Sequence, residues 1–312
     1  MAQEQQGLHL NYEEALMARA AWYYYYGNLT QNQISERLGL TRMRVMRLLD
    51  KARVSGMVQF RIRSGDERRM ELEQNLMTKY DLQDCFLVPA PLDKNDINDN
   101  VARAASMYIS NRIPEDAFIN IGYGDTAGRV LNHLARSSEG TISCVSLTGG
   151  VSYYLPNASS GFFNSKLYLI PAPLIASSEE MAAAINTEQS VREIEQLIPL
   201  SVMTVIGIGA LLEDATILRS GALSSGDFLF LKRNGAIGDI LSHFLDADGK
   251  ELESPLERRV ISPSLTTIAA LQNVIGVAAG PSKVAAITAV LRGHYLNILI
   301  TDEDTAEALL ND

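Results

Sequence analysis

The segment LTQNQISERLGLTRMRVMRLLDKA, residues 29–52, decides how the first part of this chain folds. Thr30 is followed three residues later by Gln33, the pattern of a capping box, so a short helix is expected to follow Thr30. Gly39 permits the positive φ of a tight turn, and Thr41 is a suitable N-cap for a second helix. Two short helices joined by a glycine turn are typical of the helix-turn-helix.

The second helix of this unit is expected to present a basic face to DNA. Val45 and Leu48 recur at helical spacing on its inward side, which leaves its arginines on the outer side. Arginine binds guanine edges or phosphates, and the first turn of a recognition helix lies closest to the bases. The residues of this unit that we expect to contact DNA are Gln31, Thr41, Arg42, Arg44 and Arg47.

Charge is divided unevenly along the chain. Residues 1–63 contain nine lysines and arginines and five acids, a formal charge of +4, whereas the whole chain of 312 residues carries −10. Seven of the nine bases lie within residues 41–63. A localised basic face on an acidic protein favours binding to a polyanion, although a merely solvated run of charges has the same composition.

The segments on either side extend the helix-turn-helix. Upstream, EEALMARAAWYYYYGN (13–28) has apolar residues at roughly helical spacing, which predicts a preceding helix. Most of its tyrosines are expected in the core, but Tyr25 or Tyr26 could instead place a hydroxyl on a DNA phosphate. Downstream, SGMVQFRIRS (55–64) alternates as a strand does. The sequence therefore predicts a winged helix-turn-helix DNA-binding domain over residues 1–64.

From about residue 66 the sequence alternates apolar, strand-like runs with helical stretches, the pattern of an α/β protein with a parallel sheet covered on both faces. We predict that residues 65–312 form a larger, doubly wound, mostly parallel-sheet domain that binds an effector. Ligands of such sheets bind outside the carboxyl ends of the strands. The elements expected are helices at 66–82 and 101–113 and strands at 84–90, 117–122, 141–147, 166–174, 203–209, 274–279 and 296–301.

Two glycine-containing loops follow predicted strands and suit a small ligand. Gly124 lets the backbone approach a ligand, and Asp125 and Thr126 stand where a helix with free N–H groups begins. Gly149 offers the same close approach after the next strand. The first loop lacks the third glycine of a dinucleotide fingerprint, which disfavours NAD, and a well-capped turn without a ligand is the alternative interpretation.

Two later segments add charged groups. Gly280 follows a strand, and Lys283 is expected in the first turn of the next helix, where the helix dipole disfavours a cation. A phosphate partner would explain this position, and a solvated surface lysine is the alternative. Asp239, expected between an apolar run and a helix, suits hydrogen bonds from vicinal hydroxyls or a simple helix cap. These groups predict a sugar, polyol or sugar-phosphate effector.

Other protein classes find less support. No apolar run approaches the roughly 18 residues of a membrane span, and the polar N-terminus lacks an export signal, so we expect a cytoplasmic protein without membrane contact. Cys85 and Cys144 lack a CxxC pattern and are expected as buried, reduced thiols. No His/Cys/carboxylate cluster has the spacing of metal ligands, and neither a metal nor a cofactor is predicted. The alternative to a regulator is an enzyme of the sugar-phosphate isomerase or deaminase type with a DNA-binding module, but the four histidines are scattered.

The order of motifs along the chain resembles the SorC family of sugar-responsive bacterial regulators. The resemblance covers nearly the whole chain and is carried by LTQNQISERLGLTRMRVMRLL, GYGDT, LTGG, IPAPL, GIGA, GAIGDIL, DADG and GVAAGPSKVAAI. Within the family it is strongest to repressors controlling the uptake of phosphorylated autoinducer-2, with erythritol-type polyol repressors as near alternatives. Residues 151–169 differ freely among family members, which leaves the identity of the sugar open.

The resemblance implies a DNA-binding repressor of a carbohydrate, polyol or autoinducer operon, released from its double-stranded operator by the effector. An activator is equally compatible with the sequence. The resemblance also implies a homodimer or homotetramer, and an effector domain similar to sugar-phosphate isomerases of the glucosamine-6-phosphate deaminase type that senses rather than catalyses. Family effector contacts carry over onto Gly124, Asp125, Thr126, Asp239, Leu241 and Lys283.

Overall fold

The chain forms two compact units, Met1–Asp66 and Glu67–Asp312, in a computed structural model. Each unit is described by itself. The residues that the structure describes are 2–58, 64–90, 93, 96–114, 116–137, 142–154 and 165–312.

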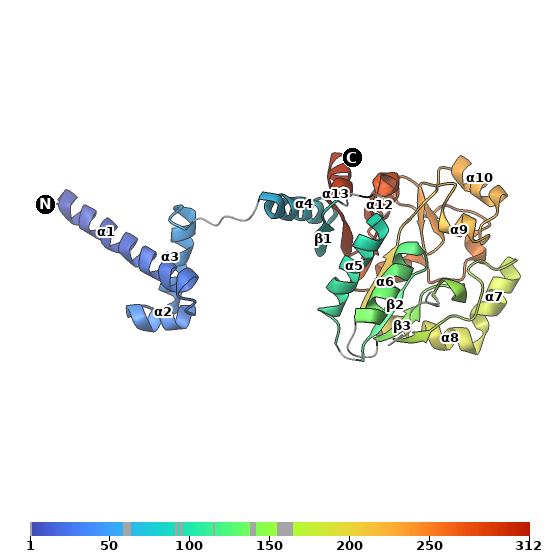
Figure 1. The fold of residues 1–312 in the computed structure, drawn as a ribbon, viewed down its shortest axis with the longest axis horizontal. Coiled ribbons are helices and arrows are strands. Elements are labelled where there is room, and N and C mark those ends of the chain that lie inside the picture. Colours follow the sequence, from blue (N-terminus) through green and yellow to red (C-terminus); the bar gives the residue numbers. More distant parts are fainter. Residues whose placement is uncertain are drawn as a thin grey trace. The chain divides into compact units, whose positions relative to one another are not determined.

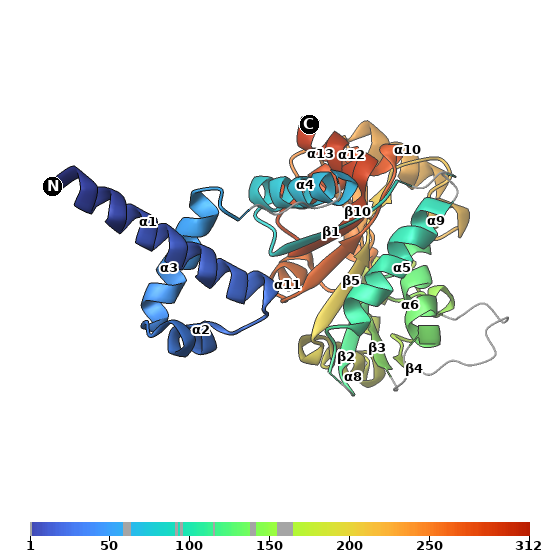
Figure 2. The ribbon, with the colours of Figure 1, turned by 60° about the vertical axis from the view of Figure 1, so that its left-hand side comes forward.

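The first unit is built from helices α1 (Ala2–Ala21), α2 (Gln31–Leu38) and α3 (Arg42–Val54) (Figure 2). The predicted capping box at Thr30 is present: the Gln33 amide donates to Thr30 Oγ1, and the Thr30 amide donates to Gln33 Oε1 at 2.9 Å. Thr41 caps α3 by accepting a hydrogen bond from an amide of its first turn. These local signals fix where both helices of the helix-turn-helix begin.

A small apolar core holds the three helices together. It is formed by Leu16, Met17, Ala20, Ala21, Ile34, Val45, Leu48, Leu49 and Ala52. The helix predicted upstream is the end of α1 followed by the π-helical turn Trp22–Tyr26. The predicted wing strand falls mostly on residues 59–63, which lie outside the described residues.

The second unit alternates strands and helices as predicted (Figure 1). Its elements are α4 (Ser64–Tyr80), β1 (Asp84–Val88), α5 (Ile97–Ser110), β2 (Phe118–Ile121), α6 (Asp125–Ser137), β3 (Ile142–Ser146), β4 (Ser165–Tyr168), α7 (Glu179–Thr187), α8 (Gln189–Glu195), β5 (Met203–Gly207), β6 (Gly209–Ala210), α9 (Thr216–Arg219), α10 (Ser225–Arg233), β7 (Gly238–Ile240), β8 (His243–Leu245), α11 (Leu265–Ala269), β9 (Val274–Val277), α12 (Val284–Arg292), β10 (Ile298–Asp302) and α13 (Glu303–Asn311).

Seven of these strands form one parallel sheet in the order β1-β10-β9-β5-β2-β3-β4. From β2 the chain builds outward through β3 and β4, and from β5 it builds the opposite way through β9 and β10. The direction of winding therefore reverses between β2 and β5. Ligand crevices of doubly wound sheets lie at the carboxyl ends of the strands at such a reversal.

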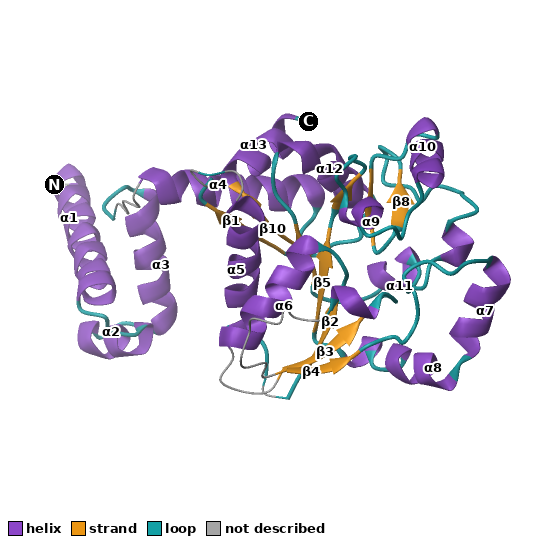
Figure 3. Cartoon of the chain, turned by 45° about the vertical axis from the view of Figure 1, so that its right-hand side comes forward, coloured by secondary structure: helices purple, strands orange, loops and turns teal. Residues whose placement is uncertain are grey.

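Alternating side chains of the strands pack into two apolar cores, one on each face of the sheet. Figure 3 shows the helices that surround the strands. Ile119 and Ile121 of β2 pack into the core that includes α5 and α6. Val145 of β3 and Leu299 of β10 pack into the core that includes α4, α12 and α13. Burial on both faces is what a parallel sheet requires, so the predicted doubly wound α/β architecture is confirmed.

Strands β6, β7 and β8 form a second, antiparallel sheet in that order. The sequence did not predict this sheet. Its strands have two or three residues, too few to produce a periodic pattern. Leu241 and Ser242 form the turn between β7 and β8 with φ of 55° and 72°, the positive values that a two-residue hairpin turn demands. Asp239 lies in β7, so the expectation that a helix follows it was wrong.

Candidate functional site

Helix α3 carries an exposed basic surface. Arg42, Arg44 and Arg47 are exposed, as is Thr41 at the start of the helix. The opposite side of α3 is buried in the core. Among the described residues, the ion pairs of α3 involve Lys51 and Arg53, and Arg42 donates only to the neutral Gln31 amide. The charges of the three arginines therefore remain available to bases and phosphates.

Two further bases of α3 are neutralised within the unit. Lys51 Nζ lies 2.7 Å from Glu13 Oε1, and Arg53 Nη2 lies 2.6 Å from Asp50 Oδ1. The basic face is therefore concentrated in the first half of α3. That half is the part of a recognition helix that approaches base edges.

The other residues predicted to contact DNA flank α3. Gln31, in the first turn of α2, accepts a 3.4 Å hydrogen bond from Arg42 Nε, which brings the two helix starts together. Tyr25 is half-buried against the core, whereas Tyr26 is exposed and stacks on Trp22 at 4.3 Å. Tyr26 is the more accessible of these two tyrosines.

A cavity of about 550 Å³ opens in the second unit at the carboxyl ends of β2, β5, β9 and β10. This is the position at which the winding of the sheet reverses. Six of the residues predicted to bind the effector line it: Gly124, Asp125, Thr126, Asp239, Gly280 and Lys283.

A buried carboxylate forms one wall of the cavity. Asp239 Oδ2 accepts hydrogen bonds from Tyr123 Oη at 2.9 Å and from the Ser242 amide at 3.2 Å. Asp239 Oδ1 lies only 2.0 Å from where a Cβ on Gly209 would be, so glycine is required in the neighbouring strand. Burial raises the pKa of Asp239, and these hydrogen bonds and nearby Lys283 only partly oppose the rise.

A half-buried lysine lies near this carboxylate. Lys283 belongs to the short 3₁₀ turn Pro281–Lys283 ahead of α12, and its Nζ donates to Ile208 O at 2.9 Å. Burial lowers the pKa of Lys283, and the charges of Asp239 and Asp125 oppose this without cancelling it. Because an ammonium has three donors, it has capacity for further acceptors such as a ligand anion.

The start of α6 contributes a hydroxyl that has no protein partner. Thr126 is buried, and its Oγ1 forms no hydrogen bond to any described residue. Asp125 beside it is held by Arg129 Nε at 3.0 Å and Asn98 Nδ2 at 3.1 Å. An unpaired buried hydroxyl costs about 1–3 kcal/mol, which a ligand could offset by bonding to it at this helix N-terminus.

Some cavity residues were not predicted from the sequence. Tyr123 lies inside the GYGDT motif and holds Asp239, which is more than a hundred residues away in the chain. Thr305, in the first turn of α13, accepts a 2.8 Å hydrogen bond from the Gly280 amide and so fixes the loop before Lys283. Thr305 could have been predicted as a cavity residue, because it is a polar residue in the first turn of a helix that follows a strand.

Gly149 and Leu241 lie outside the cavity lining. Leu241 is buried, and its Cδ2 lies 2.8 Å from where a Cβ on Gly122 would be. The Gly149 amide donates to Ile261 O at 3.0 Å, and a Cβ on Gly149 would lie 2.0 Å from Pro173 O. Both residues support the loops around the cavity by packing.

Gly149→Ala is expected to destabilise the protein by about 3 kcal/mol, because the new methyl group collides with backbone that cannot move aside as a side chain can. Gly226→Ala is the matched control, since a Cβ there meets nothing closer than Ser224 Oγ at 3.7 Å. Urea denaturation of both variants measures the difference. Equal stabilities would show that the close approach at Gly149 does not constrain the loop.

An exposed basic helix in a helix-turn-helix and a strand-end cavity with polar groups, combined in one chain, define a ligand-responsive transcriptional regulator. Residues 66–311 match the family model described as a putative sugar-binding domain, and residues 21–55 match region 4 of sigma-70. The chain belongs to the SorC family of sugar-binding transcriptional regulators. No helix among the described residues has the length and apolar character needed to cross a bilayer.

Relatives match over nearly their whole length. The transcriptional regulator LsrR of Klebsiella pneumoniae is 38% identical, with 96% of this chain and 93% of that protein covered. LsrR of Escherichia coli K12 is 36% identical, with 96% and 95% covered. The full-length sorbitol operon regulator SorC from Klebsiella pneumoniae has the same fold, with a TM-score of 0.68 at 23% identity and coverage of 95% and 98%. These relatives are regulators, and the enzyme alternative is not favoured.

Proposed function

We propose that this chain represses an operon for carbohydrate, polyol or autoinducer uptake or catabolism and releases its operator when a small effector binds. Residues 1–64 would bind DNA through α3, and residues 65–312 would bind the effector in the strand-end cavity. The observation that carries the effector assignment is the convergence there of the unpaired Thr126 hydroxyl with the Asp239 carboxylate and the Lys283 ammonium, each of which keeps capacity for further hydrogen bonds.

These groups favour a polyhydroxylated ligand that carries an anionic group. Asp239 Oδ1 has no hydrogen-bond donor among the described residues and suits the hydroxyls of a sugar or polyol. Lys283 and the free N–H groups that begin α6 suit a phosphate. Asp125, Asp214, Asp302 and Asp304 also line the cavity, and its cationic lining residues are Arg219 and Lys283. A phosphate would therefore be directed toward Lys283 or Arg219.

We infer that the regulator acts in the cytoplasm as a homodimer or homotetramer, because paired recognition helices bind the two half-sites of an operator. The effector must bind the DNA-free state more tightly than the DNA-bound state, since only such a difference can shift the equilibrium. Family membership of the chain supports this mode of action.

Two measurements on the purified full chain test the proposal. Binding to its own upstream DNA should prefer that sequence and weaken as salt rises, because phosphate contacts release counterions. A thermal-shift screen of free and phosphorylated polyols, aldoses and ketoses should identify a ligand that raises the melting temperature and lowers DNA affinity. A chain that shows no sequence preference, or whose ligand leaves DNA affinity unchanged, would refute the proposal.

Asp239→Asn is expected to raise the melting temperature of the free protein at pH 7 while weakening effector binding about ten- to hundredfold. The folded protein raises the pKa of Asp239, so its ionised form opposes folding at pH values above the ordinary carboxyl pKa. That penalty disappears as the carboxyl becomes protonated in both states, so the gain should shrink as the pH falls toward about 4. Calorimetry at both pH values checks this.

Asp248→Asn, in an exposed turn, is the matched control for the same loss of charge. It should leave effector affinity unchanged. Unaltered effector affinity in Asp239→Asn would remove this carboxylate from the binding site.

A further inference from the structure

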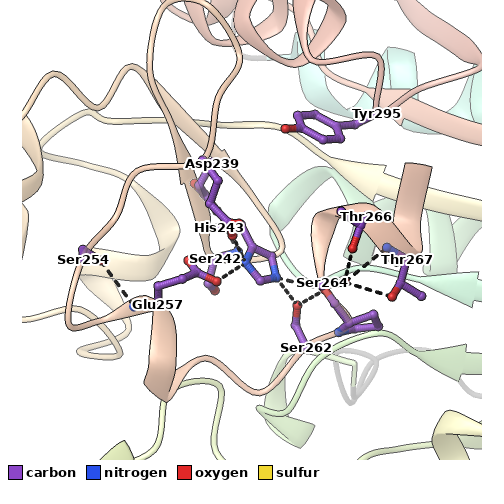
Figure 4. Close-up of polar contacts among 12 residues, drawn as sticks. Asp239, Ser242, His243, Ser254, Glu257, Ser262, Ser264, Thr266, Thr267 and Tyr295 are labelled. Carbon is purple, nitrogen blue, oxygen red and sulfur yellow. Dashed lines mark hydrogen bonds and ion pairs between the residues drawn. The ribbon is translucent and has the colours of Figure 1, made fainter. Parts of the chain in front are cut away.

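A second polar cluster lies outside the effector cavity. His243 in β8, Glu251 and Glu257 come from three segments, and their potential ligand atoms all lie within 4.8 Å of one another. His243 Nδ1 lies 2.7 Å from Glu251 Oε1 and 2.5 Å from Glu257 Oε1. Figure 4 shows the imidazole between Glu257 on one side and Ser262 on the other. None of the three residues lines the effector cavity.

The other ring nitrogen is held as a donor. His243 Nε2 lies 2.7 Å from Ser262 Oγ and 3.0 Å from Pro263 O, and Ser262 Oγ in turn donates to Pro263 O at 3.1 Å. A carbonyl oxygen only accepts, and the serine hydroxyl uses its proton on that carbonyl, so the ring proton belongs on Nε2. With Nε2 as a donor, Nδ1 points at two carboxylate oxygens, and either a second ring proton or a metal cation can bind between these three atoms.

The charge of the cluster and its exposure favour a cation from solution. Among the described residues, neither Glu251 nor Glu257 pairs with a lysine or arginine. The His243 side chain is 4% exposed, whereas those of Glu251 and Glu257 are 36% and 25% exposed. The imidazole is thus fixed in the interior with two carboxylates on its solvent side.

We propose that His243 Nδ1, Glu251 and Glu257 bind a divalent first-row transition metal ion such as Zn²⁺, with water completing its coordination. One imidazole nitrogen and two carboxylate oxygens form a ligand set that such ions accept, and a nitrogen ligand disfavours Mg²⁺ and Ca²⁺. The carbonyl at Nε2 is the outer partner that metal-binding histidines commonly have. Around a tetrahedral ion with bond lengths of about 2.0–2.2 Å the ligand atoms lie roughly 3.4 Å apart, so His243 Nδ1 and each carboxylate oxygen would separate by about 0.7–0.9 Å from their present 2.7 and 2.5 Å.

The site would tie the β7–β8 hairpin to the segment that precedes α11. His243 is separated from Asp239 by the short turn of that hairpin, so the ion would fix the strand that carries the effector carboxylate. The metal site does not depend on the identity of the effector, and each can be tested without the other.

The test uses the full chain, stripped with EDTA, dialysed against buffered micromolar Zn²⁺ and analysed for bound metal by mass spectrometry. The wild type should retain one zinc ion per chain and should give a tetrahedral or five-coordinate visible spectrum with Co²⁺. Glu251→Gln and Glu257→Gln keep the size of each side chain and should each lower zinc affinity at least about tenfold. Glu253→Gln, an exposed residue of the same segment, is the matched control and should bind zinc as the wild type does.

Two results would overturn the proposal. One is folded wild-type protein that retains no more zinc than the doubly substituted Glu251→Gln, Glu257→Gln chain. The other is equal zinc affinity of Glu251→Gln and Glu253→Gln. Circular dichroism of each variant confirms folding, so a loss of zinc cannot be attributed to unfolding.

Discussion

Lys283→Met is expected to abolish the effector response and, at the same time, to raise the melting temperature of the free protein. Lys283 is half-buried, and its desolvation lowers its pKa despite the nearby charges of Asp239 and Asp125. The ammonium therefore opposes folding at neutral pH, and methionine fills similar volume without a charge. Losing one member of a buried charge pair with a ligand costs about 2–5 kcal/mol, which is roughly thirtyfold to several thousandfold in affinity.

The pH dependence separates this explanation from a simple packing effect. A lysine whose pKa is lower in the folded state opposes folding below that pKa, and the penalty is lost as the pH rises to about 10, where the unfolded lysine also becomes neutral. The gain from Lys283→Met should therefore be largest near neutral pH. Lys250→Met, at an exposed position, is the control. Wild-type affinity of Lys283→Met for the phosphorylated ligand found by screening would place the anion elsewhere.

Opposite effects of one substitution on stability and on binding are expected at a site built for a ligand. Asp239 and Lys283 are each destabilised by burial, and Thr126 leaves a buried hydroxyl unpaired. The unit can remain folded with these unfavourable groups, because the two apolar cores on the faces of the sheet stabilise it. A ligand that satisfies all three groups gains binding free energy from each.

The helix-turn-helix could be predicted because its signals are local. Thr30, Gln33, Gly39 and Thr41 each act on backbone within a few residues, and all four occupy the cap or turn positions expected of them. The parallel sheet was also predictable, because strands buried on both faces are continuous apolar runs. The glycine loop after β2 and the segment before α12 were predicted to bind a ligand because each directly follows a strand.

The antiparallel sheet and the contacts between distant residues could not be predicted in this way. Strands as short as β6 and β7 have no measurable period, so Asp239 was assigned to a helix start. The hydrogen bond from Tyr123 to Asp239 and the approach of His243 to Glu257 depend on how the chain folds back on itself. Sequence spacing carries no information on such contacts when the partners lie on separate elements.

Arg44→Ala is expected to weaken operator binding about tenfold to hundredfold for each DNA-binding head while leaving effector binding intact. Arg44 is exposed in the first turn of α3, and the Thr41 cap fixes its backbone amide, so its side chain extends from a fixed backbone position. A bidentate contact with guanine contributes about 1–3 kcal/mol of discrimination. Fluorescence anisotropy with labelled operator measures the loss, and the slope of affinity against salt shows whether a phosphate contact was removed.

Arg53→Ala distinguishes a specific contact from the general basic charge of α3. Arg53 lies on the same helix, but its charge is already paired with Asp50 at 2.6 Å, so removing it should change operator affinity less than about twofold. If both variants lost affinity equally, the first turn of α3 would have no special role, and net charge alone would explain binding. If Arg44→Ala also lost the thermal stabilisation produced by effector, the two functions could not be assigned to separate units. If α3 binds DNA and the cavity of the other unit binds the effector, Arg44→Ala should lose operator binding and still be stabilised by the effector.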